Sequence, residues 1–581
     1  MKRFEFMAEE QNPIELLAQM ALPVQDLSRL TFCNSNKPAK LAEWASDLKA
    51  TQISHTSVVL YKALPELSKL KCNYSVRMEM LELLRPRVQH CITGLTREFL
   101  NQPVVLPETA QKTAIVAQAL QKQMLDGYLV CLADCIKSGR LKQQTYTDLS
   151  QILHRAITAI SLIFYRGFQL YTQPPQGLWK SLHALYQISE YYELNEKSVV
   201  DALLETSRTT TISAAYIRTL LLAASRPNQL NQHDVTHLNA ALETWSELVK
   251  LNKGITSNKN NLFIVNLSAG TPPTYKNRFD GKQSDLLLEI DMGALLGMLA
   301  KISTGESTPQ SSGIRVAADF PAALLQHALD AWGHVAQRGQ ERRPVQATAE
   351  ICAGLTDCHQ AIAGGMSFND FTGSINLSNP LNDREYGDFH SSVTPNGERS
   401  KAAAMPANKV SIVNASPGGY CLLWKDKMPS NIQAGEIIAI KELGRLHWSV
   451  AVIRWVKQLK QASQLGIKII SQHPKASAIA QVYDMGGHSD YMRAIHVSQK
   501  ADGRTQPTLI TATAPFGEGG KAKLLNGEQT LSIKLGKCLF STSNIKQFAF
   551  TQLEQMQDEE PRSRPVTPPS KQSFDSSWDD D

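Results

Sequence analysis

The spacing of apolar residues differs between the first and the last parts of this chain of 581 residues, and that difference limits the folds open to it. Between residues 14 and about 250, apolar side chains recur at steps of three and four, which predicts amphipathic α-helices. The clearest stripe lies within residues 108–137 and consists of Val116, Leu120, Met124, Tyr128, Cys131 and Cys135. After about residue 343 the pattern becomes short alternating runs separated by turn residues, which is typical of β-strands. Because the chain is too long for one hydrophobic core, we expect a helical region followed by a separate β region.

The β region divides into two groups of strands. A helix over Pro321–Ala336 precedes the first group. The first group is predicted at Val345–Ile351, Val410–Val413, Tyr420–Trp424, Glu436–Ile440, Ser449–Val456 and Gly466–Ile470, and the second at Tyr491–Val497, Leu509–Thr513, Leu531–Ile533 and Gln547–Gln552. The polar stretch at about 366–408 is rich in Asn, Ser, Gly and Pro and is expected to be a surface loop.

The composition is that of an ordinary globular protein. Hydrophobic residues make up 42% of the chain and charged residues 20%. The formal net charge is +6, but residues 556–581 hold seven acidic side chains against three basic ones, so the rest is mildly basic. That balance suits one phosphate-bearing ligand, whereas wrapping DNA or RNA needs a dense stripe of cations. The acidic segment has too few apolar residues to order itself and is predicted to be a disordered tail.

The cysteines and the apolar stretches indicate a cytoplasmic protein. Nine cysteines are scattered without a short-spaced framework, which fits a reducing compartment. The N-terminal sequence MKRFEFMAEEQN lacks the apolar core of a signal peptide. The most apolar stretches, 156–165 and 292–300, are too short to cross a bilayer, so no membrane span is expected.

Two short motifs stand at the borders of the first group of strands. Arg338 and Arg342 form R-x-x-x-R where the predicted helix ends, with Arg343 adjacent. Asn414, Ser416 and Gly419 form N-x-S-x-x-G just before the strand YCLLW. Taken singly, these are more often a cationic helix end and a Pro-Gly-Gly turn. Taken together and in this order, followed by VIRW at 452–455 and LGI at 465–467, they favour ligand binding.

In this order the motifs resemble those of the PilZ family, over about residues 321–472. The resemblance implies a six-stranded barrel that binds cyclic di-GMP, with Asn414 and Ser416 bonding the base and backbone of the ligand. The layout of the whole chain, with a large helical region before the barrel, is most similar to FimW-like proteins. The two motifs lie 72 residues apart, which is more than a compact barrel needs, so the 366–408 stretch must loop out.

The ligand that the resemblance implies suits these side chains. Guanine offers O6 and N7 as a paired acceptor edge, which a guanidinium fork matches. Phosphodiester oxygens likewise favour the planar, permanently charged Arg over Lys. Gly419 allows a backbone geometry or a close approach that a Cβ would block.

Signatures of catalysis or of metal binding are weak. Residues 517–521 (GEGGK) suggest a phosphate loop, but Pro515 replaces its first glycine and Ala522 its Ser/Thr, so a hairpin loop is predicted. Asp484, His488 and Asp490 lie in a turn without a second histidine nearby. Since no nucleophile elbow or HExxH is present, we expect neither an enzyme nor a cofactor.

The sequence therefore predicts an α+β multidomain protein in which an α-helical N-terminal region precedes a PilZ-type six-stranded antiparallel β-barrel. The expected divisions are a helical region (1–253), a mixed α/β linker segment (254–318), the barrel (319–475), a small β extension (476–555) and the tail (556–581). The expected function is a cyclic di-GMP receptor that signals to a protein partner, through the helical region or the tail, in motility, pilus or adhesion control. The alternative is a ligand-free helical interaction scaffold with a vestigial barrel.

Overall fold

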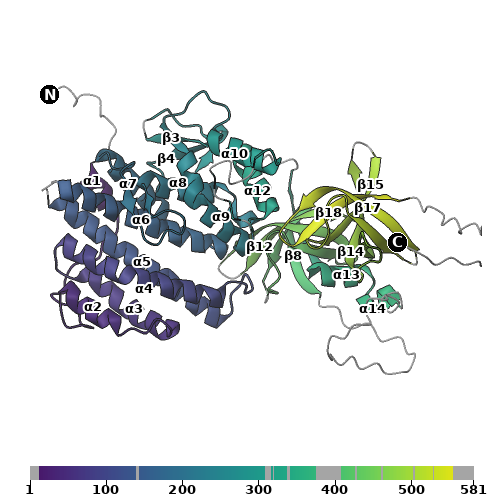
Figure 1. Cartoon of the computed structure of the whole chain (residues 1–581), viewed down its shortest axis with the longest axis horizontal. Coiled ribbons are helices and arrows are strands. Elements are labelled where there is room, and N and C mark those ends of the chain that lie inside the picture. Colours follow the sequence, from purple (N-terminus) through teal and green to yellow (C-terminus); the bar gives the residue numbers. More distant parts are fainter. Residues whose placement is uncertain are drawn as a thin grey trace, which may run out of the picture.

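A computed structural model describes residues 12–553, apart from 139–142, 285, 308–313, 315, 318, 336–340, 374–406, 426–427, 460–461, 502–503 and 528. Two of the predictions lie largely outside these residues, namely the 366–408 loop beyond residue 373 and the 556–581 tail. Within them, a helical half occupies one end of the molecule and two β-barrels the other (Figure 1). The predicted fold class is confirmed.

The helical half is built on one continuous core. Its helices are α1 (Pro13–Ala18), α2 (Pro38–Ser46), α3 (Ile53–Lys69), α4 (Tyr74–Phe99), α5 (Glu108–Lys137), α6 (Gln143–Gln169), α7 (Leu178–Tyr191), α8 (Ile212–Ala224), α9 (Gln232–Trp245), α10 (Gly293–Ser303) and α12 (Ala322–Gly333). The stripe predicted on α5 is buried apart from Val116, which is partly buried against the core. No helix in the described residues combines the length and apolar character that a membrane span needs.

Short strands complete this half. A hairpin pairs β1 (Val199–Val200) with β2 (Thr209–Thr210). A four-stranded sheet has the order β3-β6-β4-β5, formed by Lys250–Lys253, Leu287–Asp291, Phe263–Asn266 and Thr274–Tyr275 respectively. Side chains from β4, β6, α10 and α12 join the core of the helices, so α12 packs into the helical half rather than onto the barrel that follows it.

The first barrel is closed and antiparallel, with the strand order β10-β11-β12-β9-β8-β7. Its strands are β7 (Arg343–Ala353), β8 (Asn408–Ser416), β9 (Gly419–Trp424), β10 (Ile437–Glu442), β11 (Ser449–Gln458) and β12 (Ser463–Ser471). Two short helices follow β7, namely α13 (Leu355–Ile362) and α14 (Phe368–Thr372). The start of the predicted 366–408 loop is therefore helical.

The second group of strands also closes, which corrects the expectation of a small β extension. It is a six-stranded antiparallel barrel with the order β13-β14-β15-β18-β17-β16. Its strands are β13 (Lys475–Gln481), β14 (Met492–Ala501), β15 (Arg504–Ala512), β16 (Lys521–Asn526), β17 (Gln529–Ser541) and β18 (Ile545–Gln552). The glycine-rich loop at 517–520 joins β15 to β16, which do not pair, so it is not the predicted hairpin loop.

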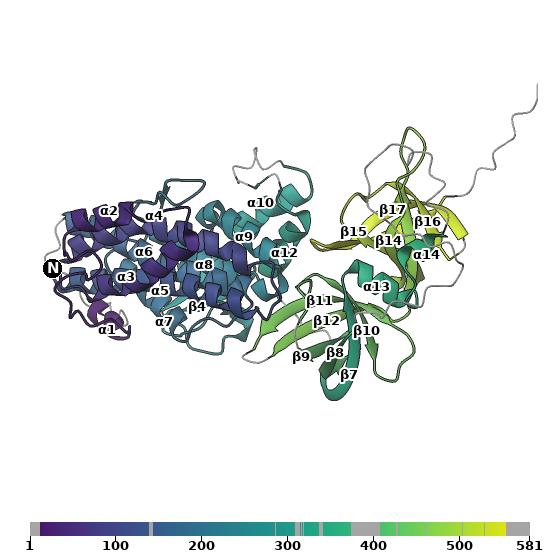
Figure 2. The same cartoon turned by 90° about the horizontal axis from the view of Figure 1, so that it is seen from below.

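The three units meet through packed surfaces. Between the two barrels, α13 covers the outer face of β10, and an apolar cluster joins Cys358 and Ile437 to Ile495 and Ile510 of the second barrel (Figure 2). On the other side, β11 and β12 of the first barrel face the helical half (Figure 2). Tyr171, from the loop after α6, is only 5% exposed and belongs to the core cluster of the first barrel.

Candidate ligand-binding site

The strand register of the first barrel brings the two sequence motifs together. Arg343 is the first residue of β7 and pairs with Ala415 of β8, while Pro344 pairs with Asn414. Arg342 immediately precedes the strand, and both arginines are exposed. Arg338 lies outside the described residues. Antiparallel pairing thus places Arg342 and Arg343 beside the N-x-S-x-x-G motif, although 72 residues separate Arg342 from Asn414 along the chain.

The second motif is a tight connection between two strands. Ser416 closes β8 and pairs with Gly419, the first residue of β9. The Ser416 hydroxyl donates a hydrogen bond to the Gly419 carbonyl oxygen at 3.2 Å, which holds the turn. This bond orders the site itself and leaves the hydroxyl oxygen able to accept from a ligand.

Gly419 is required by a close backbone approach. A Cβ at this position would lie 2.0 Å from the carbonyl oxygen of Ile467 on β12. The neighbouring Gly418 accepts a hydrogen bond from the backbone N–H of Ile469, also on β12, at 2.9 Å. The glycine therefore lets the β8–β9 turn lie directly against β12, which fits the close approach expected from the sequence.

Asn414 carries a polar atom without a partner. Its side chain is half-buried, and its Oδ1 is shielded from solvent with no hydrogen-bond partner in the described part of the chain. Buried polar atoms in folded proteins are nearly always hydrogen-bonded, and leaving one unpaired costs about 1–3 kcal/mol. The amide therefore has unused hydrogen-bonding capacity beside the arginines.

The charge of Arg342 reaches the same strands. Burial raises the pKa of the Cys421 thiol on β9, and the guanidinium of Arg342 acts against that rise. The positive charge of Arg342, which precedes β7, therefore lies near β9, the strand that begins at Gly419. Arg342 and Asn414 together offer cationic donors and an amide at one place, a combination suited to an anionic ligand with purine edges.

The later motifs, VIRW and LGI, form the neighbouring strand pair. Trp455 of β11 pairs with Gly466 of β12, and a Cβ on Gly466 would lie 1.9 Å from the indole Nε1 of Trp455. The indole therefore lies against bare backbone. A side chain larger than hydrogen at position 466 would collide with this indole.

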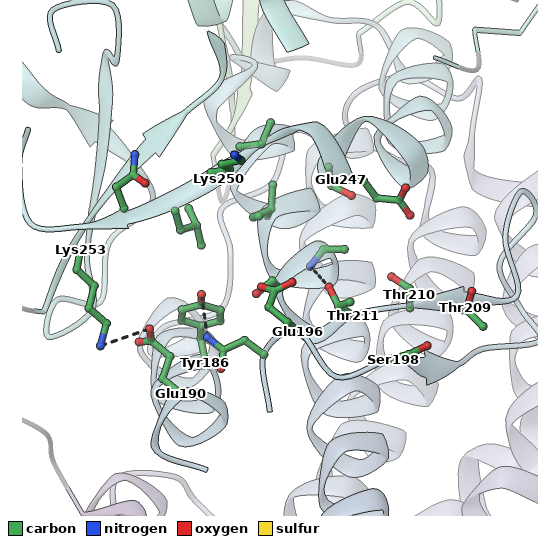
Figure 3. Close-up of a pocket in the computed structure, with 18 residues that line it drawn as sticks. Tyr186, Glu190, Glu196, Ser198, Thr209, Thr210, Thr211, Glu247, Lys250 and Lys253 are labelled. Carbon is green, nitrogen blue, oxygen red and sulfur yellow. Dashed lines mark hydrogen bonds and ion pairs between the residues drawn. The ribbon is translucent and has the colours of Figure 1, made fainter. Parts of the chain in front are cut away.

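The helical half holds a cavity of about 720 Å³ between α7, the β1–β2 hairpin, the N-terminus of α8 and β3 (Figure 3). Three carboxylates line it, those of Glu190, Glu196 and Glu247, against the two ammonium groups of Lys250 and Lys253, and Lys253 forms an ion pair with Glu190 at 3.8 Å. Carboxylates repel phosphodiesters, so this cavity is a poor match for an anionic dinucleotide. Sequence reasoning gave no signal for it, since its walls come from segments far apart in the chain.

One wall of this cavity is an open strand edge. All four residues of β3 line it, and β3 is the outer strand of its sheet. The backbone N–H of Gly254 donates to the carbonyl oxygen of Leu287 on β6 at 2.7 Å, so these two residues form a hydrogen-bonded pair. Hydrogen-bonded and non-hydrogen-bonded pairs alternate along an antiparallel ladder, so Leu251, three residues earlier, is in a non-hydrogen-bonded pair. Its N–H and C=O therefore point away from β6. Such an edge is a template for pairing with another extended segment.

Comparison with known proteins identifies relatives of all three units. The chain matches the N-terminal domain of the cyclic-di-GMP receptor FimW over residues 39–256, its middle PilZ domain over 262–394 and 374–476, and the FimW C-terminal β-barrel domain over 477–553. It is 29% identical to the cyclic-di-GMP receptor FimW of Pseudomonas aeruginosa over 98% of this chain and 99% of that protein. No solved structure matches the chain.

Proposed function

This chain belongs to the FimW family of PilZ-domain proteins, and from that premise we propose that it is a receptor for cyclic di-GMP. The site is the surface formed by the start of β7 and the β8–β9 turn. The observation that carries the proposal is the register of β7 against β8, which places Arg342 and Arg343 beside the N-x-S-x-x-G motif. The Oδ1 of Asn414 is unpaired there and shielded from solvent, so a ligand that turns this amide outward and donates a hydrogen bond to it removes the cost of leaving it unpaired.

The proposed contacts follow from the chemistry of the ligand. Arg338 and Arg342 present guanidinium forks to guanine O6 and N7 or to phosphodiester oxygens, which bind planar donors in pairs. Guanine also carries N–H donors, and Asn414 and Ser416 supply oxygens to accept from them. Gly419 keeps the turn close to β12, and Arg343, as the first residue of a strand, points to the opposite side from Arg342 and contributes less.

No bond is broken in this function. The ligand shifts the population between conformations of the receptor in proportion to its differential affinity for them, and the protein partner senses the shift. The relative from Pseudomonas aeruginosa is likewise named a receptor. We place the receptor in the reducing cytoplasm, a location supported by nine cysteines that are all free thiols.

The decisive experiment is isothermal titration of the full chain with cyclic di-GMP. We expect binding at a few micromolar or tighter, with Arg342→Ala weakening it by roughly 2–4 kcal/mol because a charged, geometrically matched donor set is lost. Arg97→Ala is the matched control, since this arginine is exposed in the last turn of α4, in the helical half. Wild-type protein that gives neither heat nor thermal shift at about 100 μM ligand would leave the ligand-free scaffold as the function.

We propose further that the receptor signals to a protein partner in the control of motility, pili or adhesion. In the helical region, the proposed contact is the open edge of β3, which can pair with an extended segment of the partner. The tail offers a second contact, with Phe574 and Trp578 as apolar anchors among acidic residues.

Two variants separate these contacts in a binding assay with a candidate partner. Leu251→Pro removes the outward N–H of β3, while Leu251→Val keeps it. A chain ending at residue 555 removes the tail, and we expect it to keep the wild-type melting temperature and ligand affinity. If partner binding survives in both Leu251→Pro and the truncated chain, neither contact carries the signal.

A further inference from the structure

The turn that follows α8 adopts a backbone conformation that its sequence does not favour. Arg226 has φ 57° and ψ 57°, the left-handed region, and it leads into the short helix η1 (Pro227–Gln229). For a residue with a Cβ this conformation costs roughly 1–2 kcal/mol. The cost is accepted here because the turn directs the Arg226 side chain at the end of α12.

Arg226 caps the helix from which the chain leaves for the ligand site. Its Nη2 donates to the carbonyl oxygen of His334 at 2.8 Å and lies 3.4 Å from the carbonyl oxygens of both Asp330 and Ala331. The same nitrogen donates to the Tyr275 hydroxyl at 2.8 Å. The last carbonyls of a helix have no intrahelical partner, so this guanidinium supplies hydrogen bonds that α12 lacks.

The body of α12 has separate attachments to the helical half. The indole N–H of Trp332 donates to the carbonyl oxygen of Leu221 at 3.2 Å, and His327 Nε2 lies 2.7 Å from the carbonyl oxygen of Ser225. Trp332 is also fully buried. Loss of Arg226 would therefore free the C-terminal end of α12 without detaching the helix.

The same turn is tied to the first barrel. The carbonyl oxygen of Leu230 accepts a hydrogen bond from the Tyr171 hydroxyl at 2.8 Å, and the Tyr171 carbonyl accepts from the backbone N–H of Gln458 on β11 at 3.0 Å. The turn at 226–230 thus holds the end of α12 on one side and β11 on the other. His334 precedes Arg342 by only eight residues.

We propose that Arg226 is a positioning residue for cyclic di-GMP binding, which presents Arg342 to the β8–β9 turn by fixing the end of α12. This inference rests on the proposed function. When the end of α12 is free, additional backbone must be ordered as the ligand binds, at roughly 1–2 kcal/mol per residue. By linkage, the bound ligand strengthens the contact between Arg226 and His334. Ligand binding is therefore coupled to the helical half through Arg226.

The test compares Arg226→Gln with Arg218→Gln, whose arginine also donates from Nη2 to a carbonyl oxygen, that of Asn239 on α9 rather than one on α12, at 2.8 Å. We expect Arg226→Gln to weaken cyclic di-GMP binding roughly tenfold, the effect of ordering about one extra residue. Arg218→Gln should lower the melting temperature about as much as Arg226→Gln does, but should change the affinity less than about twofold. In an Arg342→Ala background the effect of Arg226→Gln should shrink, because both act through one contact.

Hydrogen exchange without ligand provides a readout independent of binding. Amides at 334–335 and 341–343 should exchange faster in Arg226→Gln than in the wild type, and those of the Arg218→Gln protein should not. The positioning role is overturned if Arg226→Gln leaves the exchange rates unchanged. It is also overturned if Arg226→Gln leaves the affinity unchanged while Arg342→Ala abolishes binding. In either case the proposed function stands. A wild type that binds no ligand overturns the proposed function and the positioning role with it.

Discussion

At the scale of single residues, Asn414 separates a binding role from a structural one. Its Oδ1 is shielded and unpaired in the described part of the chain, so the amide gives little to the stability of the free protein. We expect Asn414→Ala to change the free energy of unfolding by less than about 1 kcal/mol and to weaken cyclic di-GMP binding by tenfold or more. Chemical denaturation and titration of the same preparation measure both. A large loss of stability with unchanged affinity would make Asn414 a structural residue.

Substitution of Gly419, unlike that of Asn414, is expected to lower the stability of the protein strongly. Its missing Cβ leaves room for the carbonyl oxygen of Ile467, which is backbone and cannot swing aside. Gly419→Ala must push β9 and β12 apart, and we expect a loss of about 2–4 kcal/mol in the free energy of unfolding. Gly517→Ala is the control, since open space surrounds that position. Equal denaturation midpoints for the two variants would contradict the close approach.

At the scale of elements, a buried ion pair fixes the β1–β2 hairpin, which forms one wall of the large cavity. Asp201 follows β1 directly, and its two carboxylate oxygens each accept a hydrogen bond from Arg85 of α4 at 2.7 Å. Arg155 of α6 adds a bond to the Val200 carbonyl at 3.0 Å. Burial alone would raise the pKa of Asp201, but the hydrogen bonds and charge of Arg85 lower it to about 2.

The sign of this shift gives a prediction in acid. A pKa lowered by folding contributes stability above the unfolded value of about 3.9, and that stability is lost as the pH falls toward 2. Asp201→Asn should cost about 3–5 kcal/mol at pH 7, because Arg85 keeps an uncompensated buried charge, and it should flatten the decline of stability below pH 4. Glu43→Gln breaks an exposed pair with Lys40 and should cost under about 1 kcal/mol at any pH. Parallel acid profiles for wild type and Asp201→Asn would contradict this assignment.

The elements show how far a sequence pattern reaches. All six strands of the first barrel were predicted within a few residues, because each carries β-branched or aromatic residues between clear turns. In the second barrel, β13 (KASAIAQ) and β16 (KAKLLN) were missed. Their alanines and lysines have low strand propensity, and pairing with neighbours distant in sequence decides their conformation. Without those two strands, closure into a barrel could not be inferred.

The candidate site was predictable only in part, for a related reason. The order of the motifs indicated which residues to group, and the register of β7 against β8 brings Arg343 and Asn414 close together. The unpaired amide of Asn414 depends on what surrounds it in three dimensions, which one sequence does not encode locally. The cap that Arg226 places on α12 joins residues over a hundred positions apart and carries no motif.

At the scale of the whole molecule, one hairpin tip joins all three units. The tip lies between β17 and β18 of the second barrel. Ser543 donates to both carboxylate oxygens of Asp234 on α9, at 2.9 and 2.8 Å, and Thr542 donates to the Gly435 carbonyl of the first barrel at 2.9 Å. Asn544 donates to Glu436 Oε2 at 2.6 Å. A shift of the first barrel relative to the helical half must therefore move this tip, which gives the second barrel a direct mechanical connection to the ligand-binding unit.

Asn544→Ala tests this connection through the pH dependence of stability. Burial raises the pKa of Glu436, and its hydrogen bonds from Ile437 and Asn544 act against that rise. Without Asn544 the pKa rises further, so the ionised carboxylate is the state that the variant destabilises. We expect a loss of about 1–3 kcal/mol in the free energy of unfolding above the folded pKa, which shrinks as the pH falls and Glu436 takes up a proton.

Scanning calorimetry at pH 8 and pH 4 measures this, with Asn526→Ala at the β16–β17 turn as the control from the same barrel. In the variant, the second barrel should unfold at a lower temperature than the rest at pH 8, and the two transitions should approach each other at pH 4. A pH-independent loss, or an equal loss in the control, would mean that Asn544 stabilises only its own barrel and that the hairpin tip does not connect the three units.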